Sequence, residues 1–393
     1  MSKRRISLLP SIILAIASGI GCGFFFPEWI TRIFTTFTSL FAALLDFVIP
    51  LLIVGYVAPA IAEIGRGAAK MLVATALLAY LFTLGSGMLS YGVSAVTFPA
   101  ILDTGAGSSP TAASAEAYNA APYFTIAIEP VMTVMAALVL AFILGLGTSR
   151  LSGDTMRHWL SDFRDIITMV IRGVIIPLLP LFIFGTFLKI SVTGEVAPVL
   201  ATFVKVIAVI FVMHIALLLL QYTIAWLFSG RNPLRSLATM LPAYFTALGT
   251  QSSAATIPVT LGRTIAMGVN KDVAGFVIPL CATIHLSGST LKIVACATAI
   301  MMLGGMEYDF AMMAGFIAML GITMIAAPGV PGGAIMASLG LLSSMLGFSE
   351  ADIAMMIALY IAMDSFGTAC NITGDGAIAQ IIDRIFSAKG AKS

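Results

Sequence analysis

Four polar side chains interrupt an apolar stretch near the end of the chain. Residues 358–378 read ALYIAMDSFGTACNITGDGAI, with Asp364, Thr368, Asn371 and Asp375 at successive steps of 4, 3 and 4 residues. These steps place all four on one face of a helix. A carboxylate at membrane depth is costly unless it faces a partner, a substrate or an ion. The pattern therefore predicts one wall of a binding site, with polar contacts between helices as the alternative.

A second apolar stretch, residues 270–304, is interrupted by the segment CATIHLSGSTLK. A local unwinding at Gly288 would expose backbone groups there. Lys292 lies too centrally to reach the membrane surface, so its ammonium needs an anion, either an aspartate of the first stretch or a bound substrate. His285 is the weaker candidate, because a single histidine is more often a packed, hydrogen-bonded residue than a ligand.

Two further apolar stretches carry a break near the middle. The segment SSAATIP ends at Pro258, and the segment APGVPGG contains Pro328 and Pro331. Non-helical backbone at membrane depth is tolerated where it is buried in protein or lines a cavity. Free N–H groups at such a break suit a carboxylate. A serine-rich turn that satisfies its own backbone is the alternative for the first break.

The composition sets the class of protein that must position these residues. The chain has 393 residues, of which 60% are hydrophobic and 10% charged, and its mean hydropathy is +1.06. Soluble domains have about 25% charged residues. We therefore expect an all-α polytopic membrane protein whose partners are the lipid bilayer and a small solute, without nucleic acid or cofactor. Cys22, Cys281, Cys296 and Cys370 all lie in apolar segments, which indicates reduced core residues.

Apolar runs that could span a bilayer, which takes about 20 residues, occur along the whole chain. They cover residues 7–26, 38–62, 69–99, 123–148, 165–192, 196–228, 233–260, 270–304, 308–347 and 351–386. Basic residues place both termini in the cytoplasm. They also flank 233–260 on both sides, whereas acidic residues flank 308–347, so each of these segments enters and leaves on one side. We expect eight transmembrane helices and two re-entrant hairpins arranged as inverted repeats.

The last 160 or so residues resemble the dicarboxylate/amino acid:cation symporter family, which includes the glutamate transporters. The matching segments are SSAATIPVT (252–260), PLCATIHLSGST (279–290), APGVPGGAIM (327–336) and MDSFGTACNITGD (363–375). The resemblance implies an elevator-type homotrimer in the cell inner membrane. The implied domains are scaffold helices 1–2 (1–68), transport helix 3 with an external loop (69–122), scaffold helices 4–5 (123–192) and a transport domain (193–393).

The resemblance also implies roles for individual residues. Asp364 falls where the family binds the substrate's amino group, Asn371 where it binds the α-carboxylate, and Thr368 on a side-chain contact. The hairpin tips would contribute Ser252, Ser253, Val330 and Gly332. Asp375 and Asn371 fall on one sodium site. The remaining coupling or cation positions are Tyr80, Thr83, Cys281, His285 and Ser287.

Several family residues are replaced in this chain. Ser287 and His285 stand where the family has an Asp and an Asn near a deep sodium site. Gly367 and Gln251 stand where members carry an Arg that grips an acidic side chain. Two interpretations follow: the substrate is neutral, or the positive charge has moved across the pocket to Lys292 on the facing helix. We expect sodium coupling to be reduced, lost or replaced by protons; the alternative is an ordinary sodium-coupled amino acid symporter that uses Asn371 and Asp375.

The substrate stays open between a small amino acid and a dicarboxylate. Asp364 argues for an amine, whereas neutralisation of Asp364 by Lys292 favours a carboxylate without one. Two other functional classes compete with transport. An ion channel is one alternative, because members of the resembled family leak anions; saturable uptake with counterflow would separate the two. An intramembrane hydrolase is disfavoured because Ser287 and His285 are two residues apart, on different helical faces, and no nucleophile-elbow sequence surrounds the serine.

Overall fold

A computed structural model describes residues 8–66, 70–102, 121–192, 196–325, 327 and 331–390. All regular elements in these ranges are helices, as the sequence predicts. The elements are α1 (Leu8–Gly23), α2 (Glu28–Arg66), α3 (Lys70–Ile101), α5 (Val134–Arg150), α6 (Thr155–Val170), the π-helical η1 (Ile171–Ile175), α7 (Ile176–Val192), α8 (Val196–Ser229), α9 (Pro233–Thr250), α10 (Ser253–Ala266), α11 (Lys271–Ile284), α12 (Ser287–Leu303), α13 (Phe310–Ile325), α14 (Gly333–Leu346), α15 (Glu350–Ala362) and α16 (Asp364–Gly390).

Several helices have the length and composition of membrane spans. Within the described ranges, five helical segments pass this criterion, and the bent pair α15–α16 makes a sixth if it is one span. The five are Glu28–Pro59, Lys70–Ile101, Thr155–Val192, Val199–Ser229 and Lys271–Leu303. Shorter apolar helices lie at α1, α5, α13 and α14. The membrane class is confirmed, and the count of eight spans stays a prediction.

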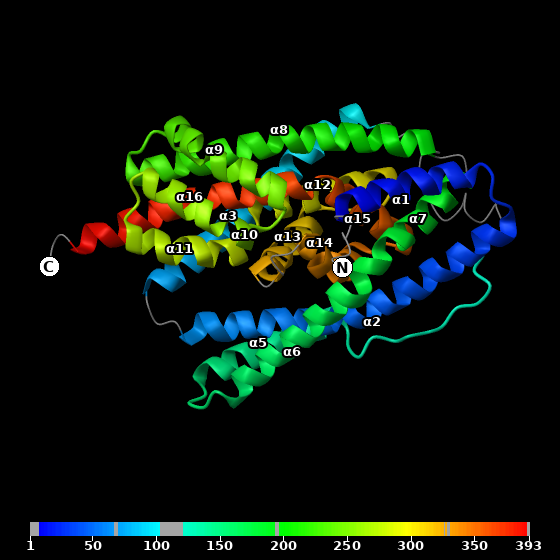
Figure 1. Ribbon diagram of the computed structural model, residues 1–393, viewed down its shortest axis with the longest axis horizontal. Helices are drawn as coiled ribbons and strands as arrows, with labels where there is room; N and C mark the ends of the chain where they lie inside the picture. The colour runs from blue at the N-terminus through cyan, green and yellow to red at the C-terminus, as the bar shows by residue number, and fades with distance from the viewer. Residues whose placement is uncertain are drawn as a thin grey trace, which may run out of the picture.

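The helices form two groups that flank a central layer. Figure 1 shows α8 and α9 along one side of the molecule and α2, α5 and α6 along the opposite side, with α3, α12 and α16 between them. α2 packs along α5, and α1 packs along α7. α16 packs against α8, α9, α11 and α12, while α3 packs along α12. The helices that carry the predicted site therefore lie at the centre of the molecule.

The first hairpin breaks earlier than predicted. α9 ends where Gln251 adopts a left-handed conformation (φ 53°) and donates its N–H to the Ala247 carbonyl. Ser252 then caps α10, because its hydroxyl accepts the N–H of Ala255. Pro258 lies inside α10, so its missing N–H does not end the helix. The hairpin therefore extends to Ala266, beyond the predicted end at residue 260.

The helix predicted at 270–304 breaks at His285 and Leu286, rather than at Gly288. α11 ends at Ile284 and α12 begins at Ser287, which puts Gly288 inside the first turn of α12. A side chain takes over the N–H groups at this helix start: the Gly288 amide donates to Oδ1 of Asn371 at 2.7 Å. Helical backbone can therefore resume before the glycine.

The stretch that carries the four polar residues is two helices, rather than one. α15 and α16 meet at Met363 with a bend of 61°. Asp364 is the first residue of α16, where the positive end of the helix dipole favours a carboxylate. The second hairpin, α13 and α14, breaks at the predicted APGVPGG segment. Val330 and most of the predicted external loop lie outside the described residues.

Candidate solute-binding site

A buried ion pair lies where α12 meets the start of α16. The Lys292 ammonium donates to Oδ1 of Asp364 at 3.1 Å. It also lies 3.3 Å from the Met363 carbonyl oxygen and 3.5 Å from the centroid of the Tyr360 ring. The Lys292 side chain is fully buried. Of the anions predicted for it, Lys292 therefore pairs with Asp364.

Gly367 leaves the space that this lysine fills. A Cβ atom at position 367 would lie 2.7 Å from both Cε and Nζ of Lys292. Cβ contacts shorter than 3.0 Å essentially never occur in proteins. A side chain at 367 and the observed position of Lys292 therefore exclude one another. The lysine at position 292 can take this place because position 367 carries a glycine and not an arginine.

The tip of the second hairpin closes onto the same carboxylate. The Gly332 N–H donates to Oδ2 of Asp364 at 2.7 Å. Gly332 has a left-handed conformation (φ 74°) and precedes the first residue of α14. The two oxygens of Asp364 thus accept hydrogen bonds from two different parts of the protein, one from α12 and one from the hairpin.

Asn371 ties the middle of α16 to the start of α12. Its Oδ1 accepts the N–H groups of Gly288 at 2.7 Å and Ser289 at 3.3 Å. Its Nδ2 donates to the Ser289 hydroxyl at 3.1 Å, and the Tyr360 hydroxyl donates to the same oxygen at 3.1 Å. Asn371 acts here as a cap for α12 supplied by another helix, which satisfies N–H groups that a helix start leaves unpaired.

A second buried pair lies one helical turn further along α16. His285 Nδ1 donates to Oδ1 of Asp375 at 2.8 Å, and both side chains are fully buried. Gln221 on α8 lies 3.5 Å from His285 Nε2 and donates to the Ser287 hydroxyl at 3.0 Å. A Cβ at Gly374 would lie 2.5 Å from Gln221 Oε1, so this glycine permits the approach of α8. Asp375 Oδ2 is buried with no hydrogen-bond partner in the described structure.

The other predicted residues have mainly local contacts. Ser252 caps α10, and Ser253 is buried in its first turn. The Thr368 hydroxyl donates to the Asp364 carbonyl at 3.0 Å. The Tyr80 hydroxyl donates to the Ala318 carbonyl of α13 at 3.3 Å, away from the His285–Asp375 pair. The remaining two are also buried: Thr83 in α3 and Cys281, whose carbonyl accepts the His285 N–H.

Three residues at the site were not predicted from the sequence. Gln221, Ser289 and Tyr360 are all buried, and they bond Ser287, Asn371 and Lys292, respectively. Gln221 lies seven residues after His214, and the His214 ring bonds the Gly288 carbonyl at 3.1 Å. Two polar residues on one face of an otherwise apolar helix were a usable signal for a buried polar surface. Tyr360 carried no such signal, because an aromatic residue in an apolar run is unremarkable.

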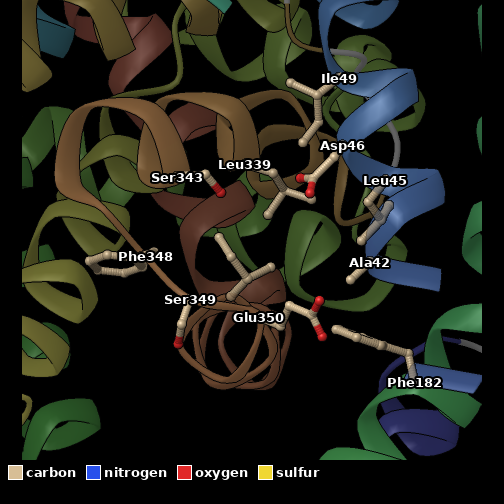
Figure 2. Close-up of a pocket in the computed structure, with 11 residues that line it drawn as sticks. Ala42, Leu45, Asp46, Ile49, Phe182, Leu339, Ser343, Phe348, Ser349 and Glu350 are labelled. Carbon is tan, nitrogen blue, oxygen red and sulfur yellow. The ribbon is translucent and has the colours of Figure 1, made fainter. Parts of the chain in front are cut away.

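A separate cavity of about 260 Å³ lies between α2, α7 and the α14–α15 connection. Figure 2 shows Asp46 and Glu350 as its labelled carboxylates, among apolar side chains from α2, α7 and α14. Its other polar lining residues are Ser343 and Ser349. Within the described residues, no group of three or more His, Cys, Asp or Glu side chains could hold a metal ion.

Comparisons with known proteins show the family to which the chain belongs. The model of the sodium:dicarboxylate symporter family matches residues 8–385. The chain belongs to this family. It is 27% identical over 395 residues to a serine/threonine transporter (SstT) of Acinetobacter baumannii, which covers 96% of this chain and 97% of the relative. It is 27% identical over 267 residues to the rat neutral amino acid transporter B(0), covering 65% of this chain and 47% of the relative.

Membership in the sodium:dicarboxylate symporter family confirms the resemblance found in the sequence and the prediction of a membrane transporter. It also excludes the hydrolase alternative, since the family and these relatives are transporters. The chain is therefore a secondary transporter.

Proposed function

We propose that this protein carries a small amino acid or dicarboxylate across the cytoplasmic membrane by an elevator movement, with sodium coupling reduced, lost or replaced by protons. The observation that carries the proposal is the buried Lys292–Asp364 pair at the meeting of α12, α16 and the second hairpin. A carboxylate in this setting needs a cation. Here the protein supplies that cation from its own chain.

The second pair supports the same interpretation of coupling. Asp375 is an expected sodium ligand, and its Oδ1 accepts a hydrogen bond from His285. The neighbouring expected ligand, Asn371, uses its Oδ1 to cap α12. Asn371 Oδ1 would have to leave its present partners to bind sodium, whereas Asp375 Oδ2 has no hydrogen-bond partner among the described residues and is available to a cation. The ordinary sodium-coupled alternative therefore requires a rearrangement at Asn371, whereas the present contacts need none.

Uptake into proteoliposomes tests the proposal. Labelled serine, alanine, aspartate and succinate are offered with a sodium gradient, with choline in place of sodium, and with choline plus a pH gradient. We expect saturable uptake that persists in choline. Complete loss of uptake without sodium would refute reduced coupling and favour the ordinary symporter. Counterflow of labelled solute separates a transporter from an ion channel, because a channel gives none.

A Lys292→Ala variant tests the role of the lysine directly. We expect lower affinity or a new dependence on sodium, because Asp364 loses its internal cation. Wild-type affinity together with wild-type cation dependence would exclude both roles proposed for Lys292, as a substrate contact and as a built-in cation.

The domain division and the assembly belong to the same proposal. The scaffold comprises residues 1–68 and 123–192, and the moving domain comprises 69–122 and 193–393, in a homotrimer of the inner membrane with both termini in the cytoplasm. Counting α1, α5 and the bent pair α15–α16 as spans gives the proposed eight. The close packing of α2 on α5 and of α3 on α12 supports the division. Native mass spectrometry measures the number of subunits.

A further inference from the structure

Both oxygens of the carboxylate at the proposed solute site already accept a hydrogen bond from the protein. Oδ1 of Asp364 accepts from Lys292 Nζ at 3.1 Å, and Oδ2 accepts from the Gly332 N–H at 2.7 Å. The Asp364 carbonyl accepts the Thr368 hydroxyl at 3.0 Å. A substrate ammonium would have to displace one of these donors or share an oxygen with it.

Displacing Lys292 is unfavourable because its charge has nowhere else to go. The side chain is fully buried. Its other contacts are the carbonyls of Met363 and Tyr360, at 3.3 and 3.5 Å, and the face of the Tyr360 ring. A buried charge that loses its partner is strongly destabilised. The pair is therefore a fixed element of the site, and Lys292 cancels the negative charge of Asp364.

Features that favour an anion remain. The starts of α14 and α16 meet at the Gly332–Asp364 contact. Helix starts carry positive partial charge and attract carboxylates. Because Lys292 neutralises the charge of Asp364, no unpaired carboxylate of the described residues at this contact opposes the positive field of the two helix starts. A substrate carboxylate is thus favoured, whereas a substrate ammonium gains little from Asp364, because Lys292 already neutralises its charge.

We infer that the site recognises the carboxylate of its substrate without using an α-amino group, and that it accepts small 2-hydroxy acids as well as the 2-amino acids of the same shape. This inference rests on the proposed transport function and specifies its substrate class. The four contacts of Lys292 and the space at Gly367 carry it.

Matched pairs of solutes test the inference on the full-length protein in proteoliposomes. The pairs are L-alanine with L-lactate and L-serine with L-glycerate, and succinate is a third class. An ion-paired hydrogen bond from a substrate ammonium to a free carboxylate contributes about tenfold or more in affinity. We expect each hydroxy acid to bind within tenfold of its amino acid, or more tightly. A preference of tenfold or more for the amino acid overturns the inference.

The design separates this inference from the proposed function. If none of the five solutes is bound or taken up, the proposed function fails. If an amino acid is transported and its hydroxy analogue is not, only the inference fails, because transport itself is then established.

Two variants release Asp364 in different ways. Lys292→Ala removes the cation, and Gly367→Ala pushes it away while keeping the charge. We expect either folded variant to shift preference toward the amino acid by about tenfold or more, since Oδ1 becomes free. Gly275→Ala is the control: a Cβ there meets nothing within 4 Å, so the preference should not change. An unchanged preference in a folded Gly367→Ala or Lys292→Ala protein contradicts the inference.

Discussion

Because Lys292 fills the space beside Gly367, adding one methyl group at position 367 should change the stability of the protein. Gly367→Ala places a carbon 2.7 Å from Cε and Nζ of Lys292 and 3.3 Å from Cδ. The lysine tip is flexible, whereas the α16 backbone is held by Asn371 and its neighbours. The lysine therefore moves, and its ammonium leaves the position from which it bonds Asp364.

The size of the effect follows from two opposing contributions. Alanine is favoured over glycine inside a helix by about 1 kcal/mol. Loss of one partner from a buried ion pair costs about 3–5 kcal/mol. The net expectation for Gly367→Ala is a destabilisation of about 2–4 kcal/mol. In a Lys292→Ala background the colliding atoms are absent, so the same substitution should stabilise by up to about 1 kcal/mol.

The assay is the free energy of unfolding of purified protein in detergent, measured for both single variants and the double variant. Gly275→Ala serves as the matched control, because the added methyl meets nothing within 4 Å. The reversal of sign between the two backgrounds is the decisive result. If the two substitutions add to within about 0.5 kcal/mol, Gly367 does not make room for Lys292 and the reasoning is wrong.

Three further predictions address the neighbouring contacts. His285→Ala leaves Asp375 buried without its partner at 2.8 Å; we expect lower thermal stability in choline that is partly restored by sodium, and equal melting in both salts would contradict this. Asn371→Leu uncaps α12, so we expect its free energy of unfolding to fall by about 0.5–2 kcal/mol. Hydrogen exchange at the amides of Gly288 and Ser289 should become faster in this variant and in no other. Cysteines at Ala42 and Ser343, which line the cavity between α2 and α14, should stop uptake when bridged by a thiol cross-linker if the two helices move relative to one another. Each single-cysteine variant is the control, and full activity of the cross-linked pair would argue against that movement.

Much of the fold follows from composition and charge placement. The all-helical membrane class rests on 60% hydrophobic residues, and the break of the second hairpin follows from its two prolines. The exact positions of other breaks depend on contacts that the sequence does not display. Pro258 and Gly288 are reasonable places for a helix to stop. The actual stops are set by the left-handed Gln251 and by Asn371, which caps α12 from another helix.

The site was predictable as a set of residues and less so as a set of pairs. The steps between Asp364 and Asp375 correctly place both on one helix, α16. Which side chain meets which carboxylate depends on the break at His285, which turns that ring toward Asp375 and leaves Lys292 for Asp364. A periodic pattern defines a face, but it does not define the register of the neighbouring helix.

The position of Asp364 couples the lysine to the second hairpin. One carboxylate accepts from Lys292 through Oδ1 and from the Gly332 N–H through Oδ2. Movement of the hairpin away from α16 would remove the Gly332 donor and leave Lys292 as the partner of Asp364. A hydrogen bond to a charged group contributes about 1.5–3 kcal/mol, and water that enters with an opening hairpin replaces part of it. The closed hairpin is then favoured by its hydrogen bond to Asp364 even before a solute binds, while Lys292 balances the charge of that carboxylate. A transporter built this way can close its binding site without taking up a cation from solution.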